Sequence, residues 1–165
     1  MNAITLLCVD DEPEVLEAVE RDLTPLEDHF PLELAASAQE AEQRIEAIIK
    51  RGDHLGVIFC DHVMPGKKGV DLLIEMAGRD ETRHTRKVLL TGQAGLEATV
   101  DAVNRAQLNH YVAKPWQPEA LRDIARREVT EFIISRKIDP LPYLQFLDPI
   151  RMSEALRRGT ALGNE

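Results

Sequence analysis

The segment 55–69, LGVIFCDHVMPGKKG, constrains the fold of this chain more than any other. Its apolar run Val57, Ile58, Phe59 and Cys60 predicts a strand that is buried on both faces. Strands of this kind occur in parallel sheets that helices cover on both sides. The carboxylate of Asp61 then falls where the strand leaves the core. It must therefore be solvated, paired with a cation or used in chemistry.

Strand and helix patterns alternate along most of the chain. Strands are predicted at residues 4–9, 32–36, 55–60, 87–90 and 110–113, and helices at about 12–23, 37–51, 70–77, 96–106 and from 119 onward. Five such units imply parallel strands joined by right-handed crossovers. The predicted fold class is α/β, a flavodoxin-like (βα)5 doubly wound parallel sheet of order 2-1-3-4-5, with a C-terminal helical extension.

Length and charge limit the classes of function. A chain of 165 residues supports one domain with a full core and a small appendage. The net charge of −9 argues against broad binding to nucleic acid or to anionic membranes. No apolar run approaches the roughly 20 residues that span a bilayer, and the N-terminal residues do not resemble a signal peptide. We therefore expect a cytoplasmic protein without a membrane partner.

Polar side chains follow four of the five predicted strands. They are Asp10 and Asp11 after the first strand, Asp61 at the third, Thr91 at the fourth and Lys114 at the fifth. The carboxyl ends of parallel strands share one edge of a sheet, where ligands bind, and in the predicted order the first and third strands are neighbours. These five side chains should therefore gather at one edge.

Three carboxylates at this edge require cations nearby. At about 5 Å each pair repels by roughly 3 kcal/mol at an effective dielectric constant near 20. Carboxylate oxygens suit Mg²⁺, Lys114 adds a second positive charge, and Thr91 adds a hydroxyl donor. This set fits in-line transfer of a phosphoryl group onto Asp61, which as a carboxylate needs no general base. Taken singly, each acid could instead cap or favour a helix N-terminus.

Four sequence motifs resemble the receiver domain of two-component response regulators, the CheY-like domain. They are LLCVDDEPEVL, FCDHVMPGKKGVDLL, VLLTG and HYVAKPW, and together they cover roughly residues 3–130. The resemblance implies a domain that takes a phosphoryl group from a sensor histidine kinase or a phosphotransfer protein. Such a domain promotes its own phosphorylation and dephosphorylation but is not otherwise an enzyme.

The resemblance also implies a role for each matching residue at the metal site. Asp61 matches the phosphoacceptor, and Asp10 and Asp11 match the pair that binds Mg²⁺ together with Asp61. Val63 matches the position that gives its backbone carbonyl to the metal. Lys67 and Lys68, in the same loop, are most simply solvated, although they could help to dock a kinase.

Four further residues match the family's phosphoryl-binding and switch positions. Thr91 and Lys114 would hold the phosphoryl oxygens, and the bond between Lys114 and Pro115 matches a cis peptide bond. Tyr111 matches the aromatic switch residue, although a half-buried core aromatic is an equally good interpretation. Phosphorylation would change the surface of the fourth helix, fifth strand and fifth helix, where a downstream protein partner would bind.

The last part of the chain is expected to be an appendage. We divide the chain into a receiver domain, residues 1–130, and a helical extension, residues 131–165. The apolar stripe of the fifth helix continues to about Lys137, and two short helices are predicted at 141–147 and 150–158. The extension is too short for a helix-turn-helix domain, so we do not expect DNA binding. Its apolar residues should fold back on the domain or meet a second subunit, and we favour a homodimer through the fifth helix.

Two other classes of function remain open from the sequence. Haloacid-dehalogenase-type phosphatases also combine an aspartate nucleophile, Mg²⁺, a threonine and a lysine, but in a D-x-D-x-T run on the first strand. The residues after the first strand, DDEPE, lack the second spaced acid and the threonine. The other class is an interaction module whose tail binds a partner whether or not Asp61 is phosphorylated.

Overall fold

A computed structural model of the chain describes residues 2–92 and 100–159. The strands are β1 (Ile4–Val9), β2 (Leu32–Ala35), β3 (His54–Asp61), β4 (Arg86–Thr91) and β5 (His110–Ala113). The α-helices are α1 (Pro13–Leu23), α2 (Ala38–Lys50), α3 (Gly69–Ala77), α4 (Val100–Ala106), α5 (Pro118–Ser135) and α6 (Pro149–Arg157). Two 3₁₀ helices, η1 (Thr24–Leu26) and η3 (Leu141–Phe146), complete the described elements.

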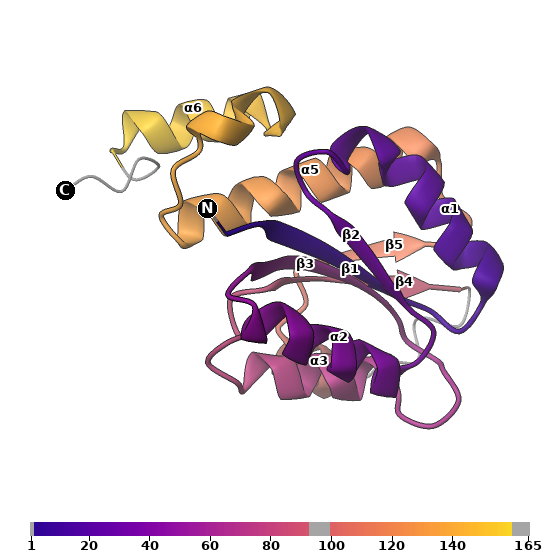
Figure 1. Cartoon of the computed structure of the whole chain (residues 1–165). Helices are drawn as coiled ribbons and strands as arrows, with labels where there is room; N and C mark the ends of the chain where they lie inside the picture. The colour runs from indigo at the N-terminus through magenta and orange to yellow at the C-terminus, as the bar shows by residue number, and fades with distance from the viewer. Residues whose placement is uncertain (1, 93–99, 160–165) are drawn as a thin grey trace.

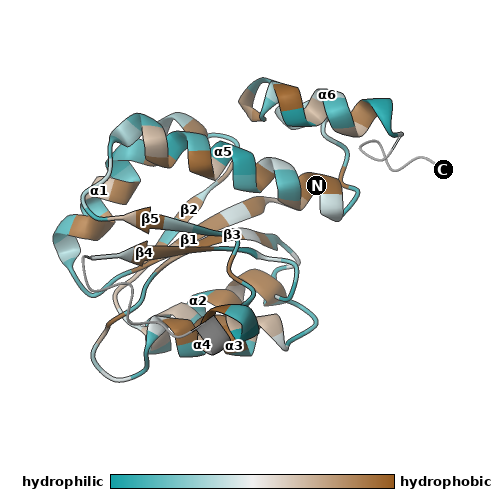
Figure 2. Cartoon of the chain, turned by 180° about the vertical axis from the view of Figure 1, so that it is seen from behind, coloured by the Kyte–Doolittle hydropathy of each residue, from teal (hydrophilic) through white to brown (hydrophobic). Residues whose placement is uncertain are grey.

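The five strands form one parallel sheet in the order β2-β1-β3-β4-β5. Helices α1 and α5 cover one face of this sheet, and α2 and α3 cover the other (Figure 1). Helix α4 lies beside α3 in the reverse view (Figure 2), and the two helices are in contact. The predicted three-layer, doubly wound fold of order 2-1-3-4-5 is therefore confirmed.

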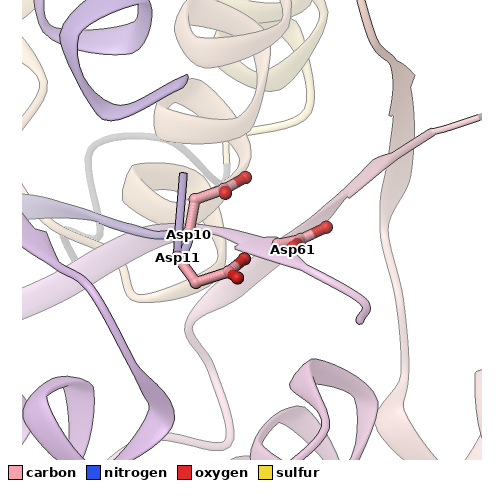
Figure 3. A group of neighbouring side chains, drawn as sticks. All are labelled: Asp10, Asp11 and Asp61. Atoms are coloured by element: carbon pink, nitrogen blue, oxygen red, sulfur yellow. The ribbon is translucent and has the colours of Figure 1, made fainter. Parts of the chain in front are cut away.

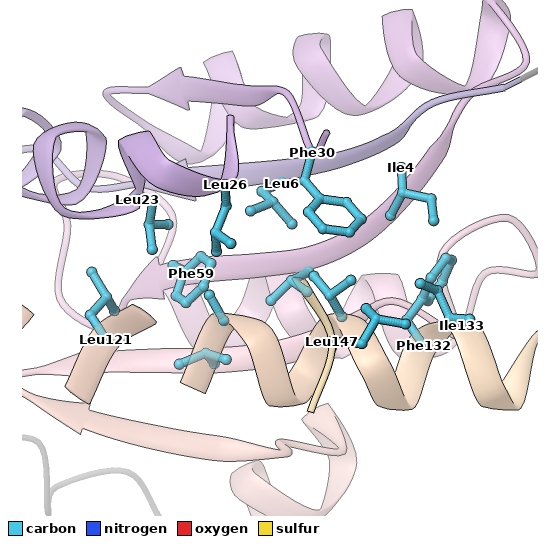
Figure 4. Close-up of a cluster of buried hydrophobic side chains, with 14 of the residues drawn as sticks. Ile4, Leu6, Leu23, Leu26, Phe30, Phe59, Leu121, Phe132, Ile133 and Leu147 are labelled. Carbon is cyan, nitrogen blue, oxygen red and sulfur yellow. The ribbon is translucent and has the colours of Figure 1, made fainter. Parts of the chain in front are cut away.

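Alternate residues of the central strands supply two separate cores. In β3, Val57 and Phe59 belong to the cluster under α1 and α5, whereas Ile58 and Cys60 belong to the cluster under α2 and α3. Figure 4 shows Phe59 on the α5 side of the sheet, facing Leu121 of that helix. Because both faces of β3 are buried, its interior run, residues 55–60, is continuously apolar.

One predicted helix boundary differs from the structure, and another lies outside the described residues. The predicted start of the fourth helix at residue 96 is in the second group, since the described part of α4 is Val100–Ala106. Helix α5 ends at Ser135 rather than near Lys137, because Lys137 adopts a left-handed conformation (φ 54°). The amide of Ile138 then donates to the carbonyl of Ile133, which closes the helix end.

The residues after α5 fold back onto the domain. Tyr143 and Leu147 are buried in the cluster under α1 and α5, together with Met152 of α6. The ring of Tyr143 stacks on Phe30, with ring centroids 5.2 Å apart. Asp148 caps α6 by accepting hydrogen bonds from the amides of the second and third helical residues. Helix α6 lies on the outer side of α5 (Figures 1 and 2).

A lysine lies inside the sheet, where the sequence pattern indicated only the start of a strand. The side chain of Lys87 in β4 is 1% exposed, and its ammonium group donates to the carbonyl of Thr85 at 3.1 Å. Its amide donates to the side chain of Asn109 at 2.7 Å. Burial lowers the pKa of Lys87 from 10.5 to about 8, with a further contribution from the positive charge of Arg86.

Replacing Lys87 by Met should stabilise the protein at neutral pH. The unfolded chain holds the proton of this lysine more tightly than the native protein, so wild-type stability rises between about pH 8 and 10.5. The shift corresponds to at most about 3 kcal/mol in favour of Lys87→Met at pH 7, and this advantage should disappear above pH 10.5. Urea unfolding of both proteins across this range measures the difference. A difference that does not change with pH would contradict the assignment.

Candidate functional site

The pairing of β1 with β3 brings three carboxylates together at the carboxyl edge of the sheet. Val9 lies opposite Cys60 in the ladder, so Asp10 and Asp61 leave their strands side by side. Oxygen atoms of Asp10, Asp11 and Asp61 all lie within 4.8 Å of one another (Figure 3). Asp10 and Asp61 are buried, at 0% and 7% exposure, whereas Asp11 is exposed. The three acids could hold a metal ion.

Lys114 completes this cluster from the other half of the sheet. Its ammonium nitrogen lies 2.7 Å from Oδ2 of Asp10 and 3.2 Å from Oδ1 of Asp61. A third carboxylate, that of Glu12, lies 3.5 Å away. The amide of Lys114 donates to the carbonyl of Thr91 at 2.7 Å, so the end of β4 fixes the position of the lysine backbone. The peptide bond to Pro115 is cis.

The electrostatics of the site follow from burial and like charges. Burial raises the pKa of Asp61, the charge of Asp10 raises it further, and Lys114 opposes both effects. The other oxygen of Asp10, Oδ1, accepts the amide of Glu12 at 2.9 Å. One lysine therefore faces at least two buried carboxylates, and a divalent cation among them would reduce the remaining repulsion.

Thr91 and Tyr111 occupy the same half of the sheet as Lys114. Thr91 is half-buried and ends β4 at the carboxyl edge. Tyr111 of β5 lies opposite Leu89 and is 49% exposed. The structure thus gathers Asp10, Asp11, Asp61 and Lys114 closely, places Thr91 at the same edge, and leaves Tyr111 with half of its surface in solvent.

The loop after Asp61 returns close to the strand that it leaves. The amide of Gly69 donates to the carbonyl of His62 at 3.0 Å. A Cβ atom on Gly69 would lie only 1.8 Å from the carbonyl oxygen of Asp61, so the motif needs a glycine here. Within the loop, Met64 is buried, and Val63 is 63% exposed.

Three ion pairs at the site and in the loop after Asp61 were not predicted from the sequence. Glu12 lies near Lys114, and Lys67 forms ion pairs with Glu42 and Glu75 instead of being simply solvated. These partners are distant in sequence from each other or lie on different elements. No local pattern of charges identifies such pairs.

Comparison with known proteins agrees with this geometry. A family model described as "Response regulator receiver domain" matches residues 6–126. The chain belongs to this family. The hydrogenase transcriptional regulatory protein HoxA of Cupriavidus necator is 34% identical over 125 residues, which are 76% of this chain and 24% of HoxA. Chemotaxis protein CheY-3 of Vibrio cholerae is 30% identical over 89 residues, which are 53% of this chain and 67% of CheY-3.

Solved structures show the same fold. The crystal structure of a putative response regulator from Chloroflexus aurantiacus superposes with a TM-score of 0.65 at 30% identity, covering 78% of this chain and 98% of that one. The chain spans about a quarter of the length of the HoxA relatives that it matches. Among the described residues, no helix is both long enough and apolar enough to cross a membrane. The matching family model and the shared fold show that the chain contains a receiver domain, which is a signalling domain rather than a conventional enzyme.

Replacing Gly69 by Ala should destabilise the receiver domain, because the new methyl group would overlap the backbone of Asp61. Overlap with backbone cannot be relieved by a side-chain rotation, so we expect a loss of about 2 kcal/mol or more in the free energy of unfolding. Gly78→Ala, at the other end of α3, is the control, since its nearest neighbour would be 3.8 Å away. Chemical denaturation of both variants tests this, and equal stabilities would contradict the packing argument.

Proposed function

We propose that this receiver domain accepts a phosphoryl group on Asp61 from a phosphohistidine of a sensor histidine kinase or a phosphotransfer protein. The observation that carries the proposal is the position of Lys114, whose ammonium group lies within hydrogen-bond distance of both Asp10 and Asp61. A cation beside a nucleophilic carboxylate is what phosphoryl transfer requires, because negative charge spreads over the transferred oxygens.

Mg²⁺ is the proposed cofactor. Asp10, Asp11 and Asp61 would hold it, and the backbone carbonyl of Val63 is the proposed fourth protein ligand. The donor set supports this assignment, since oxygen atoms of the three acids lie within 4.8 Å and hard oxygen ligands suit Mg²⁺. Bound there, the ion would neutralise part of the charge on the phosphoryl oxygens.

The chain's own residues account for the transfer step. An oxygen of Asp61 attacks phosphorus, the new bond gives an acyl phosphate, and the bond from phosphorus to the donor breaks with its electron pair leaving on the donor. Lys114 moves from Asp10 and Asp61 to a phosphoryl oxygen, and the hydroxyl of Thr91 donates to another. Water attacks the same acyl phosphate later, so the domain contributes to its own dephosphorylation.

We propose that phosphorylation of Asp61 shifts the protein toward a second conformation of β4, β5 and the residues around them. Movement of Thr91 and Lys114 toward the phosphoryl group would leave space into which Tyr111 turns. The half-exposed position of Tyr111 supports this, because an inward turn would bury ring surface that now faces solvent. A downstream protein partner would then recognise the surface of α4, β5 and α5.

The division into a receiver domain, residues 1–130, and an extension, residues 131–165, is also a proposal. The extension is proposed to respond with α5, since Tyr143 and Leu147 pack in the same cluster as that helix. A homodimer through α5 stays a prediction, and the apolar stripe that suggested it packs within this chain against the sheet, α1 and the tail. DNA is not a proposed partner, because the net charge is −9.

The alternative functions have less support. No observation favours a haloacid-dehalogenase-type phosphatase, since the family model that matches is that of the receiver domain. Steady turnover of p-nitrophenyl phosphate would support the phosphatase instead. A phosphorylation-independent interaction module would bind its partner with equal affinity with and without a phosphoryl mimic on Asp61.

The substitution Asp61→Asn should abolish formation of an acyl phosphate from acetyl phosphate and Mg²⁺, because the amide is not a nucleophile at this step. Intact-mass spectrometry measures one added phosphoryl group in the wild type and none in the variant. Chelation of Mg²⁺ with EDTA should have the same effect on the wild type. Asp28→Asn, at an exposed acid between η1 and β2 that is not part of the cluster, is the matched control and should label normally. Persistent labelling of Asp61→Asn would place the acceptor elsewhere.

A further inference from the structure

One lysine ties the loop that follows Asp61 to two helices. The ammonium nitrogen of Lys67 lies 2.8 Å from Oε2 of Glu42, which belongs to α2. The same nitrogen forms an ion pair with Glu75, which belongs to α3. The side chain of Lys67 is 29% exposed, and those of its two partners are 44% and 59% exposed. Lys67 therefore bridges the two helices on this face of the sheet from the loop between β3 and α3.

The rest of this loop has few restraints of its own. Met64 is buried in the core, and the amide of Gly69 closes the loop against His62. Between these points, Gly66 has a left-handed φ of 82° and open space around it. Lys68 is exposed and forms no ion pair with any residue that the structure describes. The two bonds of Lys67 are thus the charged restraint on residues 62–68.

This restraint matters because the loop carries Val63. When a metal ligand lies on a loop, the apparent affinity for the ion decreases as fewer molecules hold the loop in the correct position. The side chain of Val63 is 63% exposed, so packing of that side chain does little to place its carbonyl. The position of the carbonyl then depends on how the following residues are anchored.

We propose that Lys67 is a positioning residue, which holds the loop 62–68 against α2 and α3 so that the carbonyl of Val63 faces the divalent cation. This inference rests on the proposed function, in which that carbonyl is a ligand. Lys67 itself touches neither the acids of the site nor the transferred group. It acts through the backbone of the loop.

The sign of the effect distinguishes positioning from simple electrostatics. Removing a positive charge near a cation site would by itself strengthen cation binding. Loss of the bridge should weaken it instead. Loss of two partly exposed ion pairs of this kind should weaken cation binding by roughly three- to tenfold.

The test compares Lys67→Gln with Lys68→Gln in the full chain. Both variants lose one positive charge from the same loop, but only the first loses the bridge. Titration with MgCl₂ alone, followed by backbone amide shifts in NMR spectra, should give roughly threefold to tenfold weaker binding for Lys67→Gln. Lys68→Gln should bind as the wild type does or slightly more tightly. Lys67→Arg, which can span the same two carboxylates, should restore the affinity.

A second measurement examines the loop without any metal. Amide hydrogen exchange of residues 62–68 should be faster in Lys67→Gln than in the wild type and unchanged in Lys68→Gln. Glu42→Gln should weaken Mg²⁺ binding less in the Lys67→Gln background than in the wild type, because the bridge is already lost there.

The outcomes separate this inference from the function on which it rests. If the wild type binds Mg²⁺ and both lysine variants bind it equally well with equal loop exchange, the positioning role is overturned and the phosphoacceptor proposal stands. If the wild type itself shows no Mg²⁺-dependent shifts around Asp61, both proposals fail. Weaker binding that Lys67→Arg restores, together with faster loop exchange, supports the bridge.

Discussion

The arrangement of this protein depends on one contact, the bridge from Lys114 to Asp10 and Asp61. Parallel pairing of β1 with β3 places two buried carboxylates next to each other, which is unfavourable for the fold. Lys114, which lies in the turn after β5, reduces the repulsion between these two carboxylates. The carbonyl of Thr91 at the end of β4 accepts the amide of Lys114 and so fixes its backbone. The positive charge of Lys114, which would bind a phosphoryl oxygen during transfer, therefore also stabilises the buried carboxylates at the carboxyl edge of the unphosphorylated protein.

The fold was predictable because its signals are local and repeated. A strand buried on both faces is continuously apolar, and helices with one apolar face separate such strands in sequence. The place of Asp10, Asp61, Thr91 and Lys114 followed from the same topology, since carboxyl ends of parallel strands share an edge. For these residues, the strand order alone was enough to predict that they lie at the same edge of the sheet.

Other features needed coordinates because they arise from contacts between distant residues. Lys67 and Glu42 are 25 residues apart, and no periodic pattern relates a loop lysine to a helix on another layer. The buried position of Lys87 is similar, since a lysine at a strand start is usually expected at the surface. The end of α5 was misplaced by two residues because a left-handed conformation at Lys137 has no signature in the helical stripe.

The packing of the tail against Phe30 limits how a signal could travel through this molecule. Phe30 lies just before β2, and Phe132 lies against His54 at the start of β3, so the tail sits at the amino ends of the strands, opposite the acids. Tyr143, Leu147 and Met152 share a core with the sheet, and peeling them away would open that core to water. Helix α5 spans the distance between the two ends of the sheet and contacts α6, so a displacement of α5 would also change the packing of α6.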